Sequence, residues 1–118
     1  MSSGIPAVPA EAGDALADLR ERLRRFAAER DWQQFHTPKN LAMSIAIEAA
    51  EIMEHFQWLT AAQSAQLDAA AKREVAHEIA DVLLYLIRLA DVLDIDLPAA
   101  AREKIGLNAR KYPVRGGL

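Results

Sequence analysis

The fold is decided by the stretch VAHEIADVLLYLIRLADVL, residues 75–93. Its apolar residues recur at intervals of three and four, which is the period of an amphipathic α-helix, and the helix is predicted from about Leu67 to Leu93. Residues 82–87 (VLLYLI) are apolar on every side, and a helix tolerates this only where neighbours cover more than one face. We therefore expect a homo-oligomer. The predicted core stripe consists of Val75, Ile79, Val82, Leu86, Leu89 and Leu93.

Two further helices are predicted before this stretch. The first covers about residues 16–31, where leucines and a phenylalanine recur at helical spacing in a charged background. The second begins at Pro38, with Thr37 as a suitable N-cap, and its apolar stripe continues to about Thr60. A polar, alanine-rich connection separates it from the long helix.

A last helix is predicted after the long one. Asp96 and Pro98 begin it, and Lys111 closes it because Pro113 cannot continue a helix. Four helices with short connections indicate an all-α four-helix bundle. The expected organisation is a flexible amino-terminal tail at residues 1–13, one helical domain at 14–113 and a carboxyl-terminal tail at 114–118.

Size, charge and composition restrict the function. The chain has 118 residues, of which 52% are hydrophobic, and this fits one compact domain. A formal net charge of −3 provides no general basic field for nucleic acid, and the lack of cysteine excludes disulfides and cysteine-type zinc sites. The amino-terminal residues lack the features of a secretory signal, and no stretch has the length of a membrane span. We therefore expect a cytoplasmic protein that binds neither nucleic acid nor membranes.

Two pairs of acidic residues carry the predicted chemistry. Glu48 and Glu51 lie on the second helix, and Glu78 and Asp81 lie on the long one, so each pair shares one helical face. The intervening residues, 52–77, are enough to end a helix, turn and return antiparallel. Both pairs lie at the edge of an apolar stripe, where converging carboxylates repel one another unless a cation compensates. Oxygen ligands without cysteine favour Mg²⁺, with Mn²⁺ as a substitute.

Two other interpretations remain open at this point. Glutamates three or four residues apart are usually solvated or ion-paired, and the chain would then be a non-catalytic helical dimerisation module. A ferritin-like di-iron protein is also a four-helix bundle with inward-pointing acids, but it uses Glu-x-x-His motifs on two helices. This chain has one such motif, from Glu74 to His77.

The acidic motifs and their flanks together resemble a known family. They read EAAE at residues 48–51, EIADVLLY at 78–85, RDWQQFH at 30–36, FQW at 56–58, DLP at 96–98 and KYP at 111–113. Over about residues 19–113 this order is similar to the MazG-like all-α nucleoside triphosphate pyrophosphohydrolases, in particular the dCTP pyrophosphatase branch. The resemblance implies a homotetramer, a dimer of dimers, that converts a (deoxy)nucleoside triphosphate, dCTP or a modified dCTP, to the monophosphate and pyrophosphate.

The resemblance also implies roles for individual residues. Glu48, Glu51, Glu78 and Asp81 are expected to bind Mg²⁺, and Glu51 is expected to activate the water that attacks the α-phosphorus. Aromatic side chains are expected to hold the base and sugar, and the cationic and amide groups of the last helix are expected to bind phosphate. The residues expected to bind substrate are Trp32, His36, Trp58, Tyr85, Lys104, Asn108, Lys111 and Tyr112.

Two positions depart from the family pattern. The animal dCTP-specific members carry a histidine where this chain has Leu23, and this difference bears on cytosine selectivity. An acid is expected immediately before Glu78, where this chain has His77. The second departure bears on the pH dependence of the acidic site.

Overall fold

The computed structural model describes residues 12–115, and these residues form helices and no strand. The elements are α1 (Ala12–Glu29), the 3-10 helix η1 (Gln33–Phe35), α2 (Pro38–Phe56), α3 (Ala61–Ser64), α4 (Ala69–Val92) and α5 (Leu97–Lys111). The all-α prediction is therefore confirmed for the described part of the chain. The short helix α3 lies within the segment that was expected to be a polar connection.

Side-chain caps begin the helices at the predicted places. The Thr37 hydroxyl accepts a hydrogen bond from the backbone N–H of Asn40 at 3.2 Å, and Pro38 occupies the first turn of α2. Asp96 caps α5 in the same way, accepting a hydrogen bond from the N–H of Ala99 at 3.1 Å. The predicted starts of α2 and α5 are thus confirmed.

Two aspartates in the left-handed backbone region end α1 and α4. Asp31 has φ 55° and Asp94 has φ 56°, a conformation that short polar side chains tolerate better than most others. After each of them the chain folds back, and the N–H of Trp32 donates to the carbonyl of Ala27 at 2.8 Å. This turn places Trp32 beside the end of α1, where the candidate site lies.

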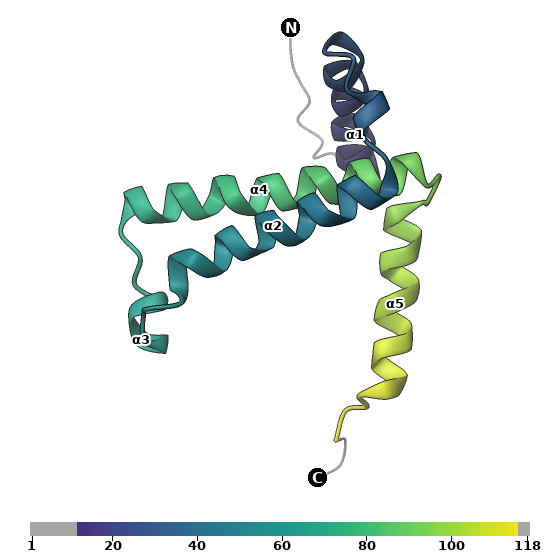
Figure 1. The fold of residues 1–118 in the computed structure, drawn as a ribbon. Coiled ribbons are helices and arrows are strands. Elements are labelled where there is room, and N and C mark those ends of the chain that lie inside the picture. Colours follow the sequence, from purple (N-terminus) through teal and green to yellow (C-terminus); the bar gives the residue numbers. More distant parts are fainter. Residues whose placement is uncertain (1–11, 116–118) are drawn as a thin grey trace, which may run out of the picture.

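The helices do not close into a four-helix bundle within one chain. α2 and α4 lie side by side and antiparallel, α1 crosses the carboxyl-terminal half of α4, and α5 extends away from this pair (Figure 1). Every residue from 99 to 115 is exposed. The four predicted helices are therefore present, but a single chain packs only three of them together.

The hydrophobic core of the described residues is small. Val75 on α4 is buried as predicted, but Ile79, Leu86 and Leu93 are 53%, 41% and 47% exposed, so their assignment to the core was wrong for the single chain. The physical reason is that, among the described elements, α2 and α1 make the main contacts with α4 and cover only part of it. The buried apolar residues are Ala27, Leu41, Val75, Ile87 and Ala90.

The division into one domain and two tails stays a prediction, and only the ends of the described helices can be set beside its boundaries. α1 begins at Ala12, so residues 12 and 13 belong to a helix and not to the expected tail. The remainder of that tail, residues 1–11, lies outside the described residues, as do residues 116–118 of the expected carboxyl-terminal tail. Among the described helices, none combines the length and the apolar character that crossing a membrane requires.

An ion pair fixes α1 across α4. Arg24 on α1 donates two hydrogen bonds to the Asp91 carboxylate on α4, one of them from Nε to Oδ2 at 2.7 Å, and the Asp91 side chain is only 11% exposed. We expect Asp91→Asn to lower the free energy of unfolding by about 1–2 kcal/mol, less than a fully buried pair contributes because Arg24 is half exposed and screened by solvent.

The hydrogen bond from Arg24 and its charge lower the pKa of Asp91. The stabilisation is therefore present above the ordinary aspartate pKa of about 4 and is lost as the pH falls through the lower folded value. Melting curves of the wild type and of Asp91→Asn, recorded from neutral pH to strong acid, should show a difference in melting temperature that disappears in acid. Asp94→Asn is the control, since it removes the same charge from an exposed residue in a left-handed turn. A difference that persists unchanged in acid would contradict this role.

Candidate active site

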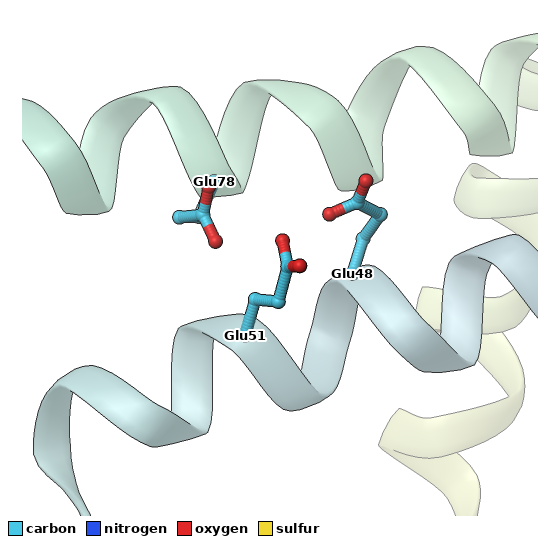
Figure 2. A group of neighbouring side chains, drawn as sticks. All are labelled: Glu48, Glu51 and Glu78. Atoms are coloured by element: carbon cyan, nitrogen blue, oxygen red, sulfur yellow. The ribbon is translucent and has the colours of Figure 1, made fainter.

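Three carboxylates from two helices meet at the contact between α2 and α4. Glu48 and Glu51 project from α2 toward Glu78 on α4 (Figure 2), and one oxygen from each residue lies within 4.8 Å of the others. The three-residue spacing places the first two on one face of α2, and the antiparallel packing brings that face against α4. The structure therefore brings together three of the four predicted metal ligands.

The three-carboxylate group is electrostatically strained without a cation. Oε2 of Glu48 is buried and has no hydrogen-bond donor. The neighbouring Glu51 carboxylate, which favours a protonated Glu48 able to hydrogen-bond to it, raises the pKa of Glu48 to about 7, and burial and the charges of the surrounding acids act in the same direction. Burial and the neighbouring Glu51 also raise the pKa of Glu78. An orphaned buried oxygen in an all-carboxylate donor set fits a hard divalent cation such as Mg²⁺ or Mn²⁺.

Asp81 lies beside this group but is not one of its three members. Its carboxylate lines the adjoining pocket together with Glu48, and its negative charge contributes to the raised pKa of Glu48. The role of Asp81 as a metal ligand stays a prediction.

An aromatic pocket of about 450 Å³ adjoins the three-carboxylate group. Three of the predicted substrate-binding residues, Trp32, His36 and Tyr85, line it. Phe26 and Trp32 pack edge to face with ring centroids 5.5 Å apart, which stiffens one wall. Its full lining is Leu19, Arg22, Leu23, Phe26, Ala27, Trp32, His36, Glu48, Asp81, Leu84, Tyr85 and Arg88.

The other predicted substrate-binding residues are not placed at this pocket by a single chain. Trp58 is 86% exposed, and it follows the carboxyl end of α2 whereas Trp32 precedes the amino end. Because α2 has 19 residues, about 28 Å of helix separate the two ends. The residues expected at the phosphates are also exposed, on α5 or directly after it: Lys104, Asn108, Lys111 and Tyr112.

The two departures from the family pattern have different surroundings. Leu23 lines the apolar wall of the aromatic pocket. His77 lines an open hollow on the outer side of the three-carboxylate group, together with Glu74. No histidine belongs to the three-carboxylate group of the described residues, and this disfavours the ferritin-like di-iron interpretation.

Arg88 is a pocket residue that the reasoning from sequence missed. It is 8% exposed, lies on α4, and donates a hydrogen bond from Nε to Nδ1 of His36 at 3.0 Å. The available signal was a cationic residue inside the apolar run LYLIRLA, residues 84–90, because such a charge is rarely buried without a partner.

Comparisons with known proteins agree with the motif-based resemblance, which they confirm. The sequence profile of the MazG-like family matches residues 43–118. Human dCTP pyrophosphatase 1 is 41% identical over 100 residues, which cover 83% of this chain and 59% of the human protein. The rat dCTP pyrophosphatase 1 is 42% identical over 101 residues, covering 84% and 59% respectively. The chain thus spans less than two thirds of the length of these relatives.

A solved structure is also similar over nearly all of the chain. The crystal structure of a pyrophosphatase from Archaeoglobus fulgidus superimposes with a TM-score of 0.81 and is 41% identical in sequence. The match covers 94% of this chain and 100% of the archaeal one. The arrangement of helices described above is therefore shared with a protein that is known as a pyrophosphatase.

Proposed function

This chain belongs to the MazG-like family, and from that premise we propose that it is a Mg²⁺-dependent nucleotide pyrophosphohydrolase. The substrate is a (deoxy)nucleoside triphosphate, dCTP or a modified dCTP, and the products are the monophosphate and pyrophosphate. The observation that supports this most directly is a shared residue, since Glu48 belongs to the three-carboxylate group and also lines the aromatic pocket. A base held in that pocket places its phosphates beside the acids.

The pocket is proposed to hold the nucleoside. Its volume of about 450 Å³ lies in the usual range for small-molecule sites, and its walls are largely apolar and aromatic. Trp32 offers a ring face for stacking, and His36 and Tyr85 offer polar atoms for the base and sugar. This division of roles explains why the aromatic and acidic residues lie next to one another.

The acids are proposed to act on the triphosphate. Glu48, Glu51 and Glu78, with Asp81 beside them, would hold Mg²⁺, or Mn²⁺ as a substitute, and when bound this ion would compensate the charges of the acids and the phosphate oxygens. Figure 2 shows the Glu51 carboxylate between those of the other two glutamates. Glu51 is proposed to accept a proton from the attacking water while the water oxygen forms a bond to the α-phosphorus. The α-phosphorus–oxygen bond to pyrophosphate breaks in the same displacement.

A homotetramer, arranged as a dimer of dimers, is the proposed assembly. The exposed apolar side chains on α4 and α5 support it, because monomeric proteins rarely leave so much apolar surface uncovered. Trp58 and the exposed end of α5 would then be free to reach a neighbouring subunit. Light scattering after size-exclusion chromatography should give a mass four times the 13.0 kDa of one chain. A monomeric mass would contradict this proposal.

The reaction is tested by product analysis with labelled water. Canonical and 5-substituted nucleoside triphosphates are incubated with the protein and MgCl₂ in H₂¹⁸O, and the products are separated and weighed by mass spectrometry. Attack at the α-phosphorus predicts the label in the monophosphate and unlabelled pyrophosphate. Diphosphate with orthophosphate would mean that a different bond is cut. No turnover of any nucleotide would favour the non-catalytic dimerisation module.

Base selectivity is tested at Leu23, which lines the apolar wall of the pocket. The selectivity is measured as kcat/KM for dCTP divided by kcat/KM for dUTP. We expect Leu23→His to raise this ratio about 3- to 10-fold. The imidazole adds one polar atom near the base edge, and a single hydrogen bond contributes about 0.5–1.5 kcal/mol. Leu19→His is the matched control, because Leu19 lines the same wall one helical turn away. An equal change in both variants would contradict a specific role for position 23.

A further inference from the structure

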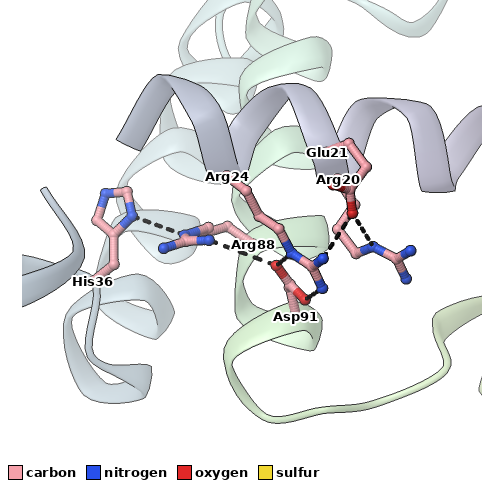
Figure 3. Close-up of polar contacts among 6 residues, drawn as sticks. All are labelled: Arg20, Glu21, Arg24, His36, Arg88 and Asp91. Atoms are coloured by element: carbon pink, nitrogen blue, oxygen red, sulfur yellow. Dashed lines mark hydrogen bonds and ion pairs between the residues drawn. The ribbon is translucent and has the colours of Figure 1, made fainter. Parts of the chain in front are cut away.

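Arg88 is the one buried charged side chain among the described residues. It helps to line the aromatic pocket. Figure 3 shows it between His36 on one side and Asp91, which contacts Arg24 of α1, on the other. A guanidinium stays ionised at any physiological pH, so its burial is unfavourable unless its N–H groups find partners. Its partners therefore show what the side chain is for.

Arg88 has two partners, and a third residue orients one of them. Its Nε donates to Nδ1 of His36 at 3.0 Å, and its Nη1 lies 3.6 Å from Oδ2 of Asp91. Asp91 in turn accepts both hydrogen bonds from Arg24 on α1. The guanidinium is thus held at both ends, by a carboxylate anchored to α1 and by the imidazole in the pocket.

The hydrogen bond from Arg88 determines the state of the His36 ring. Arginine is only a donor, so Nδ1 of His36 must present a lone pair, and the single ring proton must then be on Nε2. Burial, and then the positive charge of Arg88, lower the pKa of His36. The lowered pKa also favours the neutral ring. Figure 3 shows the other ring nitrogen pointing away from Arg88. Among the hydrogen bonds of the described residues, none is formed by that nitrogen.

His36 also belongs to the aromatic wall of the pocket. Its ring centroid lies 6.1 Å from that of Trp32, so a base stacked on Trp32 would have its edge within reach of the imidazole. The ionisable groups that line this pocket with His36 are Arg22, Glu48, Asp81, Tyr85 and Arg88.

We propose that Arg88 is a positioning residue that fixes His36 as the neutral Nε2–H tautomer, so that His36 donates a hydrogen bond to an acceptor atom on the edge of the bound base. Arg88 acts through His36 and contributes to substrate affinity more than to the chemical step. The part of this proposal that concerns the base rests on the proposed function, whereas the tautomer of His36 does not.

The tautomer is tested in the free protein by long-range ¹H–¹⁵N NMR of the imidazole rings. The chain has three histidines, and His→Gln variants assign their signals. We expect His36 to show the Nε2–H tautomer near neutral pH. In Arg88→Met the pKa of His36 should rise toward its ordinary 6.5 and the tautomers should mix, while the signals of His55 and His77 serve as internal controls. An Nδ1–H ring or an imidazolium in the wild-type protein would overturn the proposal, and this measurement needs no variant that folds poorly.

The recognition role is tested by kinetics and by binding. Arg88→Met and His36→Ala should each raise KM for dCTP about 5- to 10-fold with kcat changed less than 2-fold, and the double variant should be no worse than either one. Arg24→Met is the matched control, since it removes an arginine from the same network without removing the donor to His36. Independent, multiplying effects of Arg88→Met and His36→Ala would overturn the positioning role.

A failure of the proposed function can be recognised separately. A non-hydrolysable dCTP analogue with an imido link between the α- and β-phosphates is titrated into the same variants by calorimetry. Binding of the analogue without turnover would contradict the proposed reaction but would still measure the effect of Arg88. If the wild-type protein binds neither dCTP nor the analogue, the role in base recognition is overturned even where the NMR result stands.

Discussion

Replacing Glu51 with glutamine is expected to lower the turnover of dCTP about 1000-fold, a loss in the middle of the range that general-base groups contribute. Glutamine keeps the size of the side chain but can neither accept the proton from water nor contribute a negative charge to a cation. The folded protein should not be weakened in the absence of metal, because one repelling carboxylate has been removed from between two others. Pyrophosphate release with MgCl₂ and a melting curve without it measure the two effects.

Glu74→Gln is the matched control for this prediction. Glu74 lies on α4 one turn before Glu78, is exposed, and is not a member of the three-carboxylate group. It should retain turnover within about 2-fold, because its exposed carboxylate lines the open hollow beside the group and is not one of the three that meet. Equal losses in Glu51→Gln and Glu74→Gln would mean that general negative charge, and not the position of Glu51, supports activity.

The helices could be predicted because their signals are local. A cap such as Thr37 acts within one turn of its own position, so its chemistry can be recognised from neighbouring residues alone. The four-residue helix α3 has no apolar periodicity and depends on a capping box, in which Thr60 and Gln63 bond reciprocally to each other's backbone. Periodicity also shows which residues share a face but not what covers that face. Ile79 therefore shares a stripe with Val75 and is still exposed.

The acidic residues could be predicted as a group for a related reason. Spacing alone puts Glu48 and Glu51 on one face, and a turn before α4 brings Glu78 opposite them. The placement of Trp58 could not be predicted in this way. Both Trp32 and Trp58 flank α2 in the sequence, but they flank opposite ends of the helix, and only Trp32 lines the pocket. The contact between Arg88 and His36 joins positions 52 residues apart, and no periodic signal reports such a pair.

Removing divalent metal is expected to make the stability of the protein fall as the pH rises from about 5 to 8. Glu48 ionises near its ordinary pKa of 4.5 in the unfolded chain but only near 7 in the folded protein. Between these values the folded protein binds more protons, so the free energy of unfolding decreases with rising pH. The raised pKa of Glu78 acts in the same direction. The lowered pKa of His36 acts in the opposite direction below its ordinary 6.5, so the wild-type curve must be compared with a variant.

Glu48→Gln is that variant, because it removes the carboxyl group whose pKa is raised to about 7 and leaves His36 in place. In EDTA its melting temperature should exceed that of the wild type at pH 8, and the two should converge near pH 5, where Glu48 is mostly protonated. Added MgCl₂ should reverse this order at pH 8. A ligand at 100 times its Kd stabilises the folded protein by about 2.7 kcal/mol, and the wild type should gain more of this stabilisation than the variant, which lacks the Glu48 carboxylate as a metal ligand. Since ionised carboxylates bind the cation, the rise in melting temperature should be larger at pH 8 than at pH 5. A wild-type protein whose melting temperature responds to neither pH nor MgCl₂ would show that the three carboxylates are solvated surface groups, and the proposed metal site would then have no physical basis.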